Sequence, residues 1–304
     1  MSLEDIREFT SMPYMTIAEI GVNHNGSVDT AIEMCSEAAT AGATFLKFQK
    51  RNPNLIPEHM KEQPKSTPWG DMTYIEYKHR IELSSDDYKA IDAHCKQLGV
   101  RWSASVWDEP SLRFLLEHND DLPFIKVSSA MASNLSLVRD VAANRIPMFI
   151  STGGMTLDDI NETRRVLELE YPDTPTTFFF CRAIYPPTFG QINMSQMGSL
   201  RRAVGAVGPF KKAVTTLGYS GHERSNYPSL IAAARGVHII ERHFTLDRTM
   251  WGSDQNLSLE PREFWDLTHR LAELSVIDGD HSTAKWEPHP QEIEKLSTQR
   301  TPKE

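Results

Sequence analysis

The chain has 304 residues, a formal net charge of -9, 24% charged residues and 39% hydrophobic residues. This acidic balance argues against a nucleic-acid partner, because binding to phosphates needs a clustered excess of Lys and Arg. No segment approaches the roughly 18 apolar residues that span a bilayer, and the first residues are acidic, unlike those of a signal peptide. We therefore expect a cytoplasmic protein with no membrane partner, whose three widely spaced cysteines are reduced.

Short apolar stretches rich in β-branched residues alternate with longer stretches of helical spacing along nearly the whole chain. The expected strands are 16–23, 43–49, 100–103, 123–127, 147–150, 176–180, 215–219 and 237–241. The expected helices are 28–41, 84–98, 109–117, 135–143, 157–168, 195–204, 228–235 and 261–273. A polar insertion, 51–81, separates the second strand from its helix, and an insertion of this length usually has a function.

About eight strand–helix pairs are the number at which a parallel sheet closes into a barrel. We therefore predict an α/β protein with a TIM (β/α)8 barrel, and a doubly wound open sheet is the alternative. The barrel is expected to be one domain over residues 1–275. Residues 276–304 are polar and are expected to form an extended tail with one short helix, too short to be a second domain.

Polar and ionisable residues follow the C-terminal ends of the expected strands, where the active site of a TIM barrel lies. A single Lys at a strand end is more often a solvated residue than a ligand. Lys47 and Lys126 differ because each lies inside an apolar strand, where an ammonium group needs a carboxylate partner or an anionic ligand. Serines and the Gly153-Gly154 turn at other strand ends add hydroxyl and N–H donors for such an anion.

Two histidines also fall at strand ends. His222 and His243 lie one repeat apart, so we expect them at the mouths of adjacent strands, within reach of one metal ion. With carboxylates such as Glu19, Glu241 or Asp254 nearby, they would suit manganese, iron, cobalt or zinc. Two loop histidines with ordinary hydrogen bonds are an equally good interpretation of the spacing alone.

Several short motifs occur in the order found in a known family. They read Ala18-Glu-Ile-Gly-Val-Asn-His-Asn-Gly26, Lys47-Phe-Gln49, Lys126-Val-Ser-Ser129, Gly218-Tyr-Ser-Gly-His222, Glu241-Arg-His-Phe-Thr-Leu-Asp247 and Ser258-Leu-Glu-Pro261. With these motifs the chain resembles the N-acetylneuraminate (sialic acid) synthase family over most of its length.

The resemblance implies condensation of phosphoenolpyruvate with an open-chain aldose, an N-acetylmannosamine-like hexosamine, with phosphate release to give a sialic-acid-like 3-deoxy-2-keto acid. It implies that His222 and His243 hold a divalent metal, most often Mn²⁺, with Mg²⁺, Co²⁺ or Fe²⁺ as other candidates. The positions that match phosphoenolpyruvate-binding residues are Lys47, Ser105, Lys126, Ser129 and Ser220. The positions expected near the sugar or the metal are Glu19, Gln49, Tyr185 and Asp254. Glu19, a carboxylate inside an apolar strand, is the candidate for proton transfer.

The chain departs from the family at several positions near the acceptor. Met131 replaces an expected catalytic Glu, Ala183 an Asn, Gly221 an Asp, and Gln255 a His. We therefore expect an unusual acceptor sugar, or help from another protein. Arg182 is the candidate to make up for lost anion contacts.

Family members continue into a small antifreeze-like domain, whereas this sequence stops where that domain would begin, so the resemblance is to a barrel-only member. A homodimer is plausible from the family. Three alternatives remain open: a related 3-deoxy-ulosonate synthase, a metal-dependent aldolase with a different aldehyde, and a barrel that binds ligand without turnover.

Overall fold

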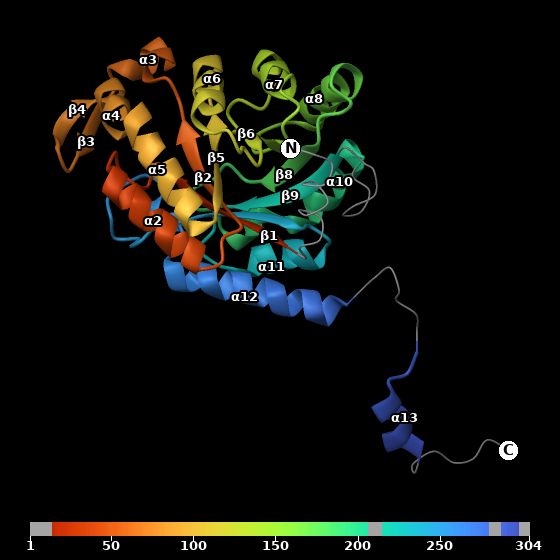
Figure 1. The fold of residues 1–304 in the computed structure, drawn as a ribbon. Helices are drawn as coiled ribbons and strands as arrows, with labels where there is room; N and C mark the ends of the chain where they lie inside the picture. Colours follow the sequence, from red (N-terminus) through yellow and green to blue (C-terminus); the bar gives the residue numbers. More distant parts are fainter. Residues whose placement is uncertain (1–13, 206–214, 280–286, 298–304) are drawn as a thin grey trace.

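Eight parallel strands form a closed barrel in the computed structural model, which describes residues 14–205, 215–279 and 287–297 (Figure 1). The strands are β1 (Met15–Gly21), β2 (Phe45–Lys50), β5 (Arg101–Val106), β6 (Ile125–Val127), β7 (Met148–Ser151), β8 (Thr176–Cys181), β9 (Thr215–Gly221) and β10 (Ile239–His243). The barrel closes because β1 pairs with both β2 and β10. The predicted TIM barrel is confirmed, and the open sheet is excluded.

One helix packs outside the barrel after each strand, as the helical periodicity predicts. These helices are α2 (Val28–Thr40), α5 (Ser85–Leu98), α6 (Glu109–His118), α7 (Leu135–Ala142), α8 (Leu157–Glu170), α10 (Met197–Val204), α11 (Tyr227–Ala234) and α12 (Pro261–Asp278). Capping boxes begin α5 at Ser84 and α8 at Thr156, which satisfies backbone N–H groups that have no helical partner. Short turns precede two of the helices: α9 (Phe189–Ile192), η2 (Met194–Gln196) and η3 (Gln255–Leu257).

The insertion after β2 is structured, although the sequence analysis predicted no elements in it. It contains η1 (Pro53–Leu55), α3 (Glu58–Lys61), an antiparallel hairpin of β3 (Pro64–Thr67) and β4 (Gly70–Thr73), and α4 (Tyr74–Ile81). Thr73 and Glu76 form a capping box that begins α4 directly after the hairpin. The insertion forms the orange group at the upper left of Figure 1.

The interior of the barrel changes from apolar to polar along the strands. The lower layer is a buried apolar cluster of Met15, Ile17, Phe45, Phe124, Phe149, Phe179 and Ile239. Alternate residues of a strand face the same side, so the residues two positions later also point inward. These residues are Glu19, Lys47, Lys126, Ser151, Cys181 and Glu241. The chemical groups therefore lie at the C-terminal half of the barrel.

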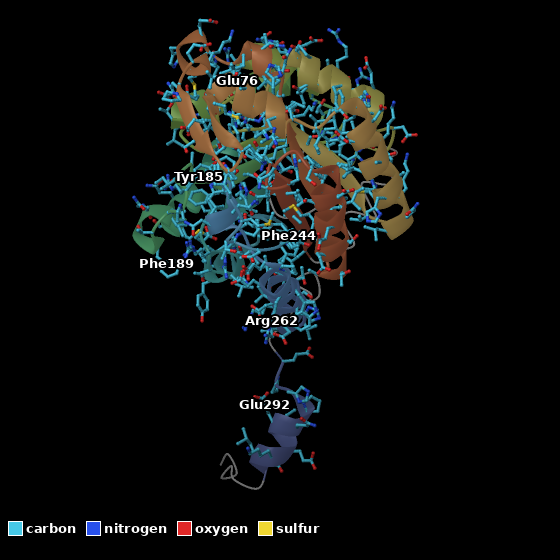
Figure 2. All side chains as sticks on the ribbon, turned by 90° about the vertical axis from the view of Figure 1, so that its left-hand side faces the viewer. Glu76, Tyr185, Phe189, Phe244, Arg262 and Glu292 are labelled. Carbon is cyan, nitrogen blue, oxygen red and sulfur yellow. The ribbon has the colours of Figure 1, made fainter. Side chains whose placement is uncertain are left out.

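The C-terminal segment differs from the barrel in burial. Helix α12 ends at Asp278, just beyond the expected boundary at residue 275, and packs on the barrel through Phe264, Leu267 and Leu271. Helix α13 (Pro290–Ser297) buries no residue and lies apart from the barrel in Figure 2, where Glu292 marks it. None of the helices among the described residues has the length and apolarity needed to cross a membrane.

Candidate active site

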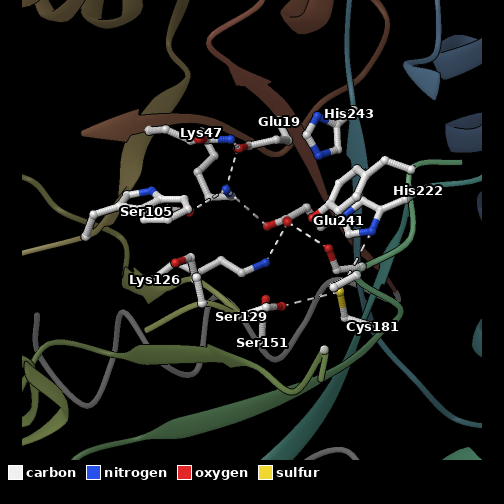
Figure 3. Close-up of a pocket in the computed structure, with 18 residues that line it drawn as sticks. Glu19, Lys47, Ser105, Lys126, Ser129, Ser151, Cys181, His222, Glu241 and His243 are labelled. Carbon is white, nitrogen blue, oxygen red and sulfur yellow. Dashed lines mark hydrogen bonds and ion pairs between the residues drawn. The ribbon is translucent and has the colours of Figure 1, made fainter. Parts of the chain in front are cut away.

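A cavity of about 340 Å³ opens at the C-terminal ends of the barrel strands (Figure 3). Ten of the twelve side chains predicted from the sequence as site residues line it. They are Glu19, Lys47, Gln49, Ser105, Lys126, Ser129, Tyr185, Ser220, His222 and His243. The other two, Arg182 and Asp254, do not line the cavity. One cavity thus brings together residues from strands that are far apart in the sequence.

Lys47 is compensated by carboxylates inside the barrel. Its ammonium group is ion-paired with Glu19 and lies 3.7 Å from Glu241 Oε2. It also donates a hydrogen bond of 2.8 Å to Ser105 Oγ. All four side chains are buried. A buried ammonium group needs such partners, because burial removes most of its hydration.

Lys126 is paired with the second buried carboxylate, Glu241. Its Nζ lies 2.5 Å from Glu241 Oε1, which also accepts a 2.9 Å hydrogen bond from Ser220 Oγ. The same ammonium group lies 4.3 Å from the centre of the Phe179 ring. Glu19 and Glu241 therefore supply the negative charges that the two buried lysines were expected to need. A bound anion would either replace these carboxylates as the partners of the lysines or bind beside them.

The two carboxyl groups have opposite pKa shifts. Burial raises the pKa of Glu19 to about 7, although the charge of Lys47 acts to lower it. Burial also acts to raise the pKa of Glu241, but Lys126 and Lys47 outweigh it and hold that pKa at about 2. Glu19 is therefore the carboxyl group that can gain or lose a proton near neutral pH.

The two histidines lie together at the rim, with ring centres 5.3 Å apart. His222 Nδ1 donates a 2.6 Å hydrogen bond to the carbonyl oxygen of Arg182, so in the neutral ring the lone pair lies on Nε2. His243 Nδ1 is buried without a hydrogen-bond partner among the described residues, and it lies 4.0 Å from Asp254 Oδ2. The ring of Tyr185 stacks on His222 at 4.2 Å.

These two imidazoles fit a divalent metal as a pair of nitrogen ligands. Burial lowers the pKa of His243 to about 3, so the ring is neutral and can bind a metal. Within the described residues, no group of three or more His, Cys, Asp or Glu is arranged to hold a metal ion.

Arg182 does not occupy the place expected for it. Its Nε donates to the carbonyl oxygen of Ile192 at 3.0 Å, and its guanidinium also contacts Gln196. These partners belong to α9 and η2, outside the cavity, because the chain turns away from the barrel after β8. Only the carbonyl group of Arg182 contributes to the site, through its hydrogen bond from His222.

Met131, the residue at the expected position of a catalytic carboxylate, is partly buried against the hydrophobic core. It does not line the cavity, whereas the neighbouring Ala130 does. Asp254 also lies outside the cavity wall, but its contact with His243 places it at the rim. The acceptor side of the site is thus built differently from the expected pattern.

Several lining residues were missing from the predicted set. Glu241 was considered only as a carboxylate near a metal, yet it forms the buried partner of Lys126. Its position two residues before His243 on β10 could have placed it on the same inward face. Cys181, expected only to be reduced, lies 3.8 Å from Ser129 Oγ. Trp107 Nε1 and Ser128 Oγ are buried without a hydrogen-bond partner among the described residues, so both can bind a ligand.

Comparison with known proteins agrees with this geometry. Residues 34–283 match the NeuB family. The chain is 37% identical to the N-acetylneuraminate-9-phosphate synthase of Drosophila melanogaster over 266 residues, 86% of this chain and 68% of the relative. It is 33% identical to an N,N'-diacetyllegionaminic acid synthase of Campylobacter jejuni, covering 88% of this chain and 78% of the relative.

Among solved structures, the chain is similar to an N-acetylneuraminic acid synthetase from Leptospira borgpetersenii, with a TM-score of 0.80 and 26% identity. The match covers 95% of this chain and 92% of that protein. Family match, relatives and fold agree over the same barrel, which carries the paired lysines and histidines. The chain belongs to the NeuB family.

Proposed function

We propose that this protein joins phosphoenolpyruvate to an open-chain N-acetylated hexosamine and releases phosphate, giving a sialic-acid-type 3-deoxy-2-keto acid. The observation that carries the proposal is the pair of buried lysines, Lys47 and Lys126, facing His222 and His243 across one cavity. The names of the relatives support it, because they are synthases of N-acetylneuraminate 9-phosphate and of diacetyllegionaminic acid.

Phosphoenolpyruvate carries a phosphate and a carboxylate, so its site needs at least two cations and several hydrogen-bond donors. Lys47 and Lys126 would supply the charge. Hydroxyl groups of Ser105, Ser128 and Ser129 would supply donors, and that of Ser128 has no protein partner among the described residues. With the phosphate and carboxylate held by the lysines, the carbon that reacts would face the histidines on the other wall of the cavity.

His222 and His243 would hold a divalent metal, with Mn²⁺ as our first candidate and Mg²⁺, Co²⁺ or Fe²⁺ as others. When bound, such a metal acts as a Lewis acid that makes the sugar aldehyde more electrophilic. The protein fixes His222 through the carbonyl group of Arg182 and the stacked ring of Tyr185.

In the proposed reaction, C3 of phosphoenolpyruvate forms a bond to the aldehyde carbon, whose oxygen takes up one proton. A water molecule then adds at C2 and loses one proton. The C–O bond to phosphate breaks last, and the C2 hydroxyl proton leaves with the phosphate. Because its pKa is about 7, Glu19 can both donate the first proton and accept the one from water.

The test measures phosphate release from phosphoenolpyruvate by the purified, Mn²⁺-loaded protein with N-acetylmannosamine and a panel of other aldoses. The mass of the product identifies the acceptor and separates this reaction from an ulosonate synthase or an aldolase. We expect release to depend on one sugar class and to be lost in His222→Ala. Tight phosphoenolpyruvate binding without release, for any sugar, would favour a binding barrel instead.

A further inference from the structure

A buried arginine lies behind the histidine pair of Figure 3, on the outer face of the barrel wall. Arg242 directly precedes His243 on β10, and because side chains alternate along a strand, it points away from the cavity. Its side chain is only 1% exposed. A guanidinium group that is buried so deeply needs hydrogen-bond acceptors and a negative charge close to it.

The loop that follows β9 supplies the acceptors. Arg242 donates a hydrogen bond to the carbonyl oxygen of Glu223 and a second one, of 2.9 Å, to that of Ser225. It also donates a 3.1 Å hydrogen bond to Ser229 Oγ on α11. This loop begins directly after His222. Arg242 therefore joins the backbone beside one histidine to the strand that carries the other.

The side chain of Glu223 supplies the negative charge. Its Oε1 lies 3.4 Å from Arg242 Nη1, and its Oε2 accepts a 2.9 Å hydrogen bond from the hydroxyl group of Tyr219. Glu223 Oε1 accepts no hydrogen bond from the described residues, so the ion pair with Arg242 is what compensates it. Because Tyr219 lies on β9, the carboxylate connects β9 to β10.

The carboxylate of Glu223 lies where a side chain at position 221 would lie. Gly221 is the neighbour of Arg242 across the two parallel strands. A Cβ atom at Gly221 would be only 2.6 Å from Glu223 Oε1, so the two could not both be accommodated without a shift. Gly221 replaces the Asp of the family pattern, and the sequence analysis placed this departure near the acceptor. Gly221 does not line the cavity, however, so the departure concerns the outer face of the wall.

We propose that Glu223 is a positioning residue of the histidine pair, and that its carboxylate replaces the missing side chain at Gly221 as the partner of Arg242. Through Arg242 it fixes the ends of β9 and β10, which carry the two histidines. The inference rests on the proposed function, because that function assigns a divalent metal to this pair. Residues that orient the ligands of a metal typically change its affinity about 10- to 100-fold when they are mutated.

The test measures the dissociation constant of Mn²⁺ from the full chain without turnover, using the electron paramagnetic resonance signal of the free ion. Glu223→Gln keeps a hydrogen-bond acceptor for Tyr219 but leaves Arg242 buried without a carboxylate. We expect the dissociation constant of Mn²⁺ to rise about tenfold. Calorimetric binding of phosphoenolpyruvate to the metal-free protein should change less than about twofold, because Lys47 and Lys126 lie on other strands.

Moving the carboxylate from one position to the other tests the replacement directly. Gly221→Asp alone should weaken Mn²⁺ binding, because the new side chain meets the carboxylate of Glu223. The double variant Gly221→Asp with Glu223→Ala again has one carboxylate beside Arg242, so its dissociation constant should return to within about threefold of the wild type. A Cβ atom at 221 would also lie 2.9 Å from Tyr219 Cε1, but this ring can shift once its hydrogen bond to Glu223 is gone.

Glu82→Gln is the matched control. It removes another largely buried carboxylate, which is paired with Lys50 at 2.6 Å and does not line the cavity. This variant should have a lower Tm and an unchanged dissociation constant for Mn²⁺. Should Glu223→Gln fail to fold, Tyr219→Phe removes only the hydrogen bond to Glu223 and should raise the dissociation constant about threefold.

The outcomes separate this inference from the proposed function, which the condensation assay tests. An unchanged Mn²⁺ dissociation constant in Glu223→Gln would overturn the positioning role, and so would an equal rise in Glu82→Gln or in the binding of phosphoenolpyruvate. A double variant that binds Mn²⁺ no better than Gly221→Asp would overturn the replacement. The expected changes in a protein that condenses no sugar would support the positioning role and overturn the proposed function. A wild type that binds no Mn²⁺ would overturn both.

Discussion

Two sets of cations surround this site, and they are compensated in different ways. In the barrel, Lys47 and Lys126 each contact a buried carboxylate. In the insertion, Arg51, Lys65 and Lys78 contact aromatic rings and have no ion pair among the described residues. To bind an anion, the barrel lysines would exchange or share their carboxylate partners, whereas the insertion cations have no such partner to give up.

Breaking a barrel pair should have the largest effect on stability. Lys126→Met leaves Glu241 buried with only the more distant Lys47, at 3.7 Å, as a cationic partner. We expect the free energy of unfolding to fall by about 3 to 5 kcal/mol, since the uncompensated charge remains in the interior. Urea denaturation followed by circular dichroism measures the change.

The double variant Lys126→Met with Glu241→Gln is the control for that loss. Removing both charges should restore part of the stability, because no unpaired carboxylate remains. A loss smaller than about 1 kcal/mol in Lys126→Met would contradict the idea that the barrel charges depend on pairing.

Glu19 should make the stability of the protein fall as pH rises, the opposite of the dependence that the lowered pKa of Lys78 gives the insertion. The pKa of Glu19 rises from an ordinary value of 4.5 to about 7 in the folded protein, because the carboxyl group is buried. The folded state then binds more protons than the unfolded state between these values, so stability falls as pH rises from about 4.5 to 7. The loss attributable to Glu19 is about 3 kcal/mol at most.

Comparing the wild type with Glu19→Gln over this pH range isolates the contribution of Glu19. The variant should gain stability relative to the wild type as pH rises, and its turnover should fall, because an amide cannot carry out the proton transfers assigned to Glu19. Parallel stability curves for the two proteins would rule out a raised pKa for Glu19.

The barrel could be predicted from the sequence because its signal is local and repeated. Each strand is a short apolar run and each helix has its own periodicity, so the expected strand 147–150 lies within one residue of β7 (Met148–Ser151) at each end. The insertion gave no such signal, because its hairpin and helix are short and polar. The domain boundary at 275, the cytoplasmic location and a homodimer stay predictions.

The site residues that lie on the strands could be predicted for the same reason. Side chains alternate between the two faces of a strand, so the residues that point into the barrel can be identified from the sequence. Arg182 could not, because it lies beyond the end of β8, where the direction of a loop decides its contacts. The pairing of Lys126 with Glu241 could not be predicted either, because the two residues are 115 positions apart in the chain. Pairing between distant strands depends on the closed barrel and not on local pattern.

The substitution Met131→Glu tests whether the site has lost activity because a catalytic carboxylate is missing, or instead works without one. Met131→Glu restores the carboxylate that the family pattern leads us to expect, but the side chain at this position packs against the core outside the cavity wall. We expect no gain in phosphate release and a loss of stability of about 1 to 3 kcal/mol, because the carboxylate would be partly desolvated. A large rise in turnover with any aldose would indicate a decayed site instead.

The smallest effect on stability should come from the insertion. Lys78→Met removes a buried charge that has no acidic partner and keeps the apolar stem among the tyrosine rings. The lost cation–π contacts and the relieved burial oppose each other, and the lowered pKa of Lys78 shows that burial outweighs the contacts, so Lys78→Met should be no less stable than the wild type at pH 6. Because the pKa of Lys78 is lowered to about 7, from 10.5, the folded wild type binds fewer protons than its unfolded state between these values. Wild-type stability should therefore rise relative to Lys78→Met as pH increases from 7 to 10. A loss as large as that of Lys126→Met would mean that Lys78 supports the fold as the barrel lysines do, and the contrast between paired and available cations would fail.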